Sequence, residues 1–76
     1  MITYGIYSIK DTVTGNFSDI IIMVNEEAAK RYFMGLCQES KIKNDLQLYC
    51  LGSYNVETGE IESKVDFIVG GADFNV

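Results

Sequence analysis

Residues 25–39 form the one stretch of this chain with an unambiguous helical pattern, and that stretch constrains the fold more than any other. Asn25 suits the N-cap, because its side-chain oxygen can accept a hydrogen bond from an N–H group of the first turn. Glu26 and Glu27 then lie at the positive end of the helix dipole. One apolar stripe follows at helical spacing, formed by Ala29, Tyr32, Phe33, Leu36 and Cys37. The stripe predicts that one side of the helix packs against the rest of the chain.

Gly35 is unusual inside this helix, because a glycine there costs about 1 kcal/mol relative to alanine. We expect a strand or a partner helix to approach closely at this position.

Segments rich in β-branched and aromatic residues lie on both sides of the helix and predict strands. Asp11 and Gly15 are the turn formers between the first two strands, and Gly59 is expected to take a positive φ between the last two. The two turn sequences are similar, which indicates two hairpins with the same turn chemistry rather than a duplicated domain. The predicted strands cover residues 2–9, 17–24, 46–54 and 65–69.

The resulting order is β-β-α-β-β, which predicts an α+β fold with an antiparallel sheet and one helix packed on one face. We expect a single domain over residues 1–76, with a loose tail from about residue 70. The second strand is apolar on both faces, so it is expected to be covered on both sides. Gly52 is expected to mark a bulge or a close backbone approach in the third strand.

One helix can cover only one face of the sheet. The opposite face is expected to carry Tyr7, Tyr49 and Leu51. Exposed apolar patches of this kind usually mark interfaces, and two-fold dimers are the commonest oligomers. We therefore expect a homodimer through this face, with coverage by the tail as the alternative.

The composition argues against several classes of function. The net charge is −5 and the chain has no histidine, so metal sites and histidine-based catalysis are not expected. Cys37 and Cys50 form no CxxC motif and lie on apolar faces, so we expect free thiols in a reducing compartment. No catalytic motif is present, and neither enzyme activity nor a cofactor is expected. The longest apolar run, residues 20–24, is too short for a signal peptide or a membrane span.

One local group of basic residues stands out in this acidic chain. Combined with exposed tyrosines, it could bind single-stranded nucleic acid by charge and base stacking. The alternative is ordinary solvated lysines together with tyrosines of the core or of a dimer interface. The candidate residues are Lys30, Arg31, Lys41, Lys43, Tyr7 and Tyr49.

A family resemblance rests on three parts of the chain: Tyr4 with Tyr7 and Ser8, residues 25–33, and residues 44–61. Its most specific part runs from Leu48 to Gly59. The sequence resembles the small non-structural protein of gokushoviruses, phages of the Microviridae with circular single-stranded DNA genomes. The chain departs from the family pattern in having no proline after the helix, and its tail after Ile61 has no clear counterpart.

The resemblance implies a phage early protein in the host bacterial cytoplasm, of a kind described as DNA-binding factors in the switch to single-stranded genome synthesis. DNA binding by so acidic a chain is expected to be weak and sensitive to salt. The competing hypothesis is a protein–protein adaptor or assembly factor, with a phage or host replication protein as partner and no DNA contact.

Overall fold

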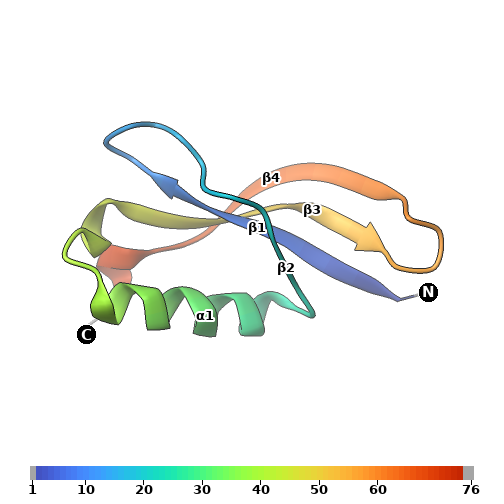
Figure 1. The fold of residues 1–76 in the computed structure, drawn as a ribbon, viewed down its shortest axis with the longest axis horizontal. Helices are drawn as coiled ribbons and strands as arrows, with labels where there is room; N and C mark the ends of the chain where they lie inside the picture. The colour runs from blue at the N-terminus through green and yellow to red at the C-terminus, as the bar shows by residue number, and fades with distance from the viewer. Residues whose placement is uncertain (1, 75–76) are drawn as a thin grey trace.

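The computed structural model describes residues 2–74. Its strands are β1 (Thr3–Asp11), β2 (Ile21–Met23), β3 (Leu46–Asn55) and β4 (Ile61–Gly70), and its helix is α1 (Glu26–Glu39). Short 3₁₀ helices cover Lys43–Asp45 and Gly71–Asp73. The four strands form one antiparallel sheet in the order β2-β1-β3-β4, and α1 runs along it on one side (Figure 1). The predicted α+β fold and element order are confirmed.

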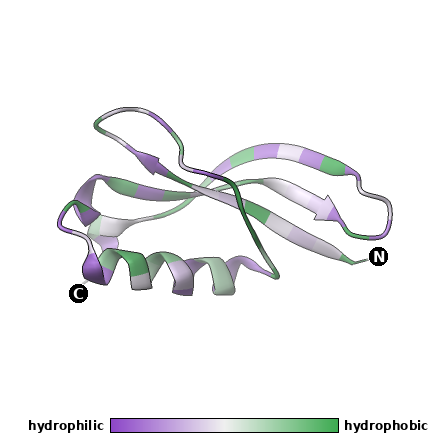
Figure 2. Ribbon diagram, in the orientation of Figure 1, coloured by the Kyte–Doolittle hydropathy of each residue, from purple (hydrophilic) through white to green (hydrophobic). Residues whose placement is uncertain are grey.

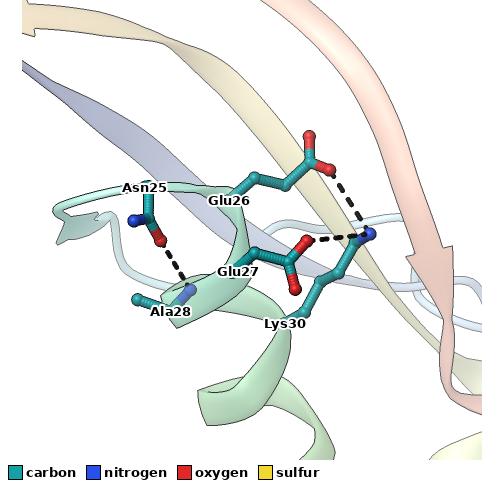
Figure 3. Close-up of polar contacts among 5 residues, drawn as sticks. All are labelled: Asn25, Glu26, Glu27, Ala28 and Lys30. Atoms are coloured by element: carbon teal, nitrogen blue, oxygen red, sulfur yellow. Dashed lines mark hydrogen bonds and ion pairs between the residues drawn. The ribbon is translucent and has the colours of Figure 1, made fainter.

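Local signals define the start of α1. The Asn25 side chain accepts a hydrogen bond from the Ala28 N–H at 2.9 Å, as predicted for an N-cap. The Lys30 ammonium lies 3.3 Å from Glu26 and 3.8 Å from Glu27 (Figure 3). The helix ends where the Ser40 N–H donates to the Cys37 carbonyl.

The core lies between α1 and one face of the sheet. The helix contributes Ala29, Phe33 and Cys37, which pack with Tyr7 of β1 and Leu48 of β3. Two members of the predicted stripe do not join them, because Tyr32 is 44% exposed and Leu36 is 39% exposed. A single helix on a sheet buries only the narrow strip that faces the strands, so the apolar stripe is wider than the contact.

Gly35 lies on the exposed side of α1, and a Cβ atom added there would have nothing within 4 Å. The prediction that a strand or helix approaches closely at this position is wrong. The position is open because it faces away from the sheet.

The second strand is shorter than predicted, covering Ile21–Met23 instead of residues 17–24. The regular backbone ladder is interrupted at Ser18, because its hydroxyl takes the place of a backbone carbonyl and accepts from the Ile9 N–H at 3.1 Å. Phe17 therefore pairs with Lys10 only through an isolated bridge. β2 is an edge strand, and Ile22 is half exposed. The expectation of coverage on both sides is wrong.

Gly52 marks a bulge in β3, as predicted. On β1, Ile6 pairs with Gly52 and Tyr7 pairs with Cys50, so Leu51 is the extra residue. The φ of Gly52 is +147°, and a side chain there would collide with the Glu62 carbonyl. The bulge shifts the alternation of the strand. Tyr54 consequently lies on the face of Tyr49, and not with Leu48 and Cys50 as simple alternation predicts.

The two hairpin turns share one hydrogen-bond pattern, which confirms the similarity seen in the sequence. The side chain of the first residue, Asp11 or Asn55, accepts from the backbone N–H two residues later at 2.9 Å. The glycine four residues later donates its N–H to the carbonyl of that first residue at 2.8 Å. Gly15 and Gly59 have φ values of +78° and +79°, so glycine is favoured at both positions.

The segment after β4 folds back onto the core. The Phe74 ring lies 5.7 Å from that of Phe33, and the Lys43 ammonium donates to the Phe74 carbonyl at 3.1 Å. The expected loose tail from about residue 70 is therefore ordered up to residue 74, because an aromatic side chain near its end fills the core. Residues 75–76 lie outside the described part of the chain.

Candidate interaction surface

The sheet face opposite α1, which we call the outer sheet face, is largely apolar. Strand pairing defines it, since directly paired residues share a face. Tyr4 pairs with Tyr54, Ile6 with Ile22, and Tyr49 with Phe67. Alternation along β4 adds Val65, and apolar and hydrophilic positions alternate along this strand in Figure 2. The apolar members are Tyr4, Ile6, Ile22, Tyr49, Tyr54, Ile61, Val65 and Phe67 from the strands, together with Phe17 from the β1–β2 loop.

An aromatic cluster forms at one end of the outer sheet face. The Tyr49 ring lies 5.3 Å from the Phe17 ring and 5.7 Å from the Phe67 ring, both in edge-to-face geometry. The Lys10 ammonium lies 5.7 Å and 5.9 Å from the Phe17 and Tyr49 ring centres. Phe17 is 43% exposed and Phe67 is 52% exposed, so the cluster remains open to a partner.

A pair of serines positions this cluster. Ser8 is completely buried, and its hydroxyl donates to the Ser18 carbonyl at 2.8 Å. The Ser18 N–H donates to the Ile9 carbonyl at 2.8 Å. These bonds attach the β1–β2 loop to β1 and place Phe17 beside Tyr49. The sequence reasoning missed Phe17, Phe67 and Lys10, although the spacing of Val65 and Phe67 is a signal for a shared strand face.

Tyr7 does not belong to the outer sheet face. It is 4% exposed and packs in the core under α1, so its predicted roles in nucleic-acid binding and in the dimer interface are corrected. Burial raises the pKa of its phenol, and the neighbouring Cys50 and Glu26 raise that pKa further. The phenol is therefore neutral at neutral pH.

Tyr49 lies on the outer face as expected, and Leu51 is the half-buried bulge residue of β3. Their proposed interface role stays a prediction.

The four predicted basic residues do not gather around Tyr49. Lys30 and Arg31 are in α1, whereas Lys41 and Lys43 follow its C-terminal end. Lys30 and the end of the helix at Glu39 are about 14 Å apart along the axis, at the rise of an α-helix. Lys30 contacts Glu26 and Glu27, and the Lys43 ammonium is bound to the Phe74 carbonyl. The structure thus separates the predicted charges from the predicted stacking side chain.

Both cysteines are free, as predicted. Burial raises the pKa of the Cys37 thiol, and the nearby Lys43 lowers it by a smaller amount, so Cys37 is not an activated thiol. Within residues 2–74, no three Cys, Asp or Glu side chains are grouped to hold a metal ion. No helix in this described part is both long and apolar enough to cross a membrane.

Together, residues 2–74 form a small α+β fold with one antiparallel sheet, whose apolar outer face the helix does not cover. Residues 4–74 match the family model described as the Phage ORF5 protein. The chain belongs to this phage protein family. No curated protein and no solved structure matches the chain.

Proposed function

We propose that this chain is a non-enzymatic accessory protein of a single-stranded DNA phage that works by binding another protein through its outer sheet face. The observation that carries the proposal is the open apolar face itself, on which Phe17, Ile22, Ile61, Val65 and Phe67 are each at least 43% exposed. Exposed apolar surface on this scale usually marks a binding site. The resemblance described above ties this activity to genome replication, or to its switch to single-strand synthesis, in the host bacterial cytoplasm.

The charge distribution favours a protein over DNA as the partner. Binding to a phosphate backbone requires several lysines or arginines on one surface. Lys10 is the one charged side chain among the strand residues that the structure places on the outer sheet face. The whole chain carries a net charge of −5, so its long-range field repels DNA.

Single-stranded DNA is the second candidate, and the position of Lys10 over the Phe17 and Tyr49 rings favours it. Exposed aromatic rings can stack on bases while a neighbouring cation contacts a phosphate. One cation per site makes such binding weak and strongly dependent on salt.

A capture experiment tests the main proposal. The tagged chain and its Phe67→Ser variant are used to capture proteins from phage-infected cells. Tyr32→Ser is the matched control, because Tyr32 is a 44% exposed aromatic residue on the helix side. We expect Phe67→Ser to lose a captured phage or host protein that Tyr32→Ser retains. Equal capture by both variants would reject the outer sheet face as the binding surface.

Fluorescence anisotropy with a labelled single-stranded oligonucleotide at low salt tests the second candidate. If DNA is bound at the cluster, Lys10→Gln weakens the binding while Arg31→Gln does not. An unchanged signal at tens of micromolar protein eliminates the DNA candidate.

A further inference from the structure

We propose that the partner on the outer sheet face is a second copy of this chain, so that two sheets stack face to face in a two-fold dimer. The inference rests on the proposed function, because it names the partner of the same surface.

The accessible surface of the single chain is larger than expected for a compact monomer. It measures 5105 Å², whereas a compact monomer of this mass is expected to expose about 4,700 Å². The molecule extends 39 × 22 × 16 Å, the shape of a layer and not of a sphere. Stacking two such layers through their apolar faces makes a thicker and more compact particle.

The apolar area on the outer sheet face fits what a stable dimer needs. Half-exposed side chains of this size each present on the order of 100 Å². Together they present about 600 Å² per copy, which lies at the lower end of the roughly 600–1,000 Å² that each partner contributes to a standard protein interface. The half-exposed contributors are Tyr4, Phe17, Ile22, Ile61, Val65 and Phe67.

The positions of the charged side chains also favour the outer sheet face as the dimer contact. Asp11, Glu62 and Asp66 pair with strand residues of the helix side, so the carboxylates of the described strands point away from the outer sheet face. Two copies that each carry −5 repel one another. Stacking through the outer sheet face brings them together without placing strand carboxylates against each other.

The sheet edges are poorer contact surfaces. β2 is an edge strand of only three residues. β4, the other edge, carries Glu62, Lys64 and Asp66, with the Lys64 ammonium 3.8 Å from the Asp66 carboxylate. Short edge strands and edge charges are features that discourage pairing with another chain. Self-association is therefore directed to the face and not to the edges.

The proposed dimer has a consequence for function. Stacking the outer faces leaves one α1 on each outside surface, so the same helix surface is presented twice in opposite directions. Any further phage or host partner would then meet two identical sites.

Sedimentation equilibrium over a range of concentrations tests the inference on the wild-type chain, on Val65→Lys and on Ile42→Lys. Val65 is 61% exposed on the outer sheet face, and Ile42 is 51% exposed after α1, so both lysines can be solvated in a monomer. We expect the wild type and Ile42→Lys at twice the chain mass of 8.5 kDa. We expect the dimer dissociation constant of Val65→Lys to rise at least about a hundredfold, because a dimer of this variant would bury two unpaired lysine charges, one from each copy.

Circular dichroism keeps the test interpretable, because Val65→Lys must retain the wild-type spectrum for its loss of association to count. A wild type that sediments at 8.5 kDa at every concentration overturns the dimer. A Val65→Lys protein that remains dimeric also overturns it, because the contact then lies elsewhere. If the wild type is monomeric and Phe67→Ser still loses a captured protein, the second copy is rejected while the proposed function stands.

Discussion

Gly52 occupies the most demanding backbone position in the described chain. Its φ of +147° is rarely adopted by residues with a side chain, and a Cβ atom would collide with the Glu62 carbonyl of β4. We expect Gly52→Ala to lower the free energy of unfolding by about 3 kcal/mol or more, since both strain and a backbone clash are introduced.

Urea denaturation measures the effect, with Gly15→Ala as the control. Gly15 also has a positive φ, but a Cβ atom there meets nothing within 4 Å. Gly15→Ala should lower the free energy of unfolding by only about 1–2 kcal/mol, which is the strain of a left-handed residue that carries a side chain. Equal losses in the two variants would show that the bulge tolerates a side chain.

Tyr7 makes stability depend on pH in the alkaline range. Its pKa in the folded state is raised above 10.0, first by burial and then by Cys50 and Glu26. Above pH 10 the unfolded chain loses the phenol proton first, so the stabilising contribution falls as pH rises through the folded pKa. We expect Tyr7→Phe to lose less stability than the wild type between pH 9 and pH 11, about the normal range of tyrosine titration.

Chemical denaturation at several pH values checks this expectation. At pH 7 the two proteins should differ by less than about 1 kcal/mol, because the substitution removes only a hydroxyl. Parallel pH profiles would contradict the role of the Tyr7 phenol.

The residues that the sequence placed incorrectly share one physical cause. Residues 2–9 have apolar side chains on both faces, so alternation alone could not say which face meets α1. The structure puts Tyr7 under the helix beside Gly5, where a Cβ atom would overlap the Tyr7 ring. The outer-face position of Tyr49 was predictable from alternation. That of Tyr54 was not, because the bulge residue Leu51 intervenes.

At the scale of elements, the exposed glycine of α1 offers a gain in stability. Gly35 has open space around its Cα atom and points away from the sheet. We expect Gly35→Ala to raise the free energy of unfolding by about 1 kcal/mol, the difference in helix propensity. Thermal and urea denaturation measure it. Ala28→Gly, in the first turn of the same helix, should shift stability in the opposite direction, and a destabilising Gly35→Ala would show that the position is in contact with a partner.

Elements with local start and stop signals were predicted well. The extent of α1 follows from the Asn25 cap and the spacing of its buried residues, and the two turns follow from Asp11, Asn55 and their glycines. The length of β2 could not be predicted in this way. It depends on the Ser8–Ser18 contact, which is between side chain and backbone and leaves no hydrophobic pattern in the sequence.

At the scale of the whole molecule, the sequence predicted two layers but not the segment after β4 that completes the core. The apolar stripe and the strands indicate a helix on a sheet, and that arrangement is observed. The packing of Phe74 on Phe33 was not foreseen, because a short segment after Gly70 and Gly71 carries no periodicity. The residues of the outer sheet face were only partly predicted, because Phe17 reaches this face from the β1–β2 loop and not from a strand.

The proposed dimer makes thermal stability depend on protein concentration, because association stabilises the folded state by mass action. A tenfold increase in concentration adds about 1.4 kcal/mol per dimer. For a folding unit of two 76-residue chains, this should raise Tm by about 3–5 °C. Scanning calorimetry of the wild type at two concentrations measures the shift, and Val65→Lys should show none. A wild-type Tm that does not change with concentration would mean that the outer sheet face stays exposed in the isolated protein. The partner of this face would then be a molecule other than a second copy of the chain.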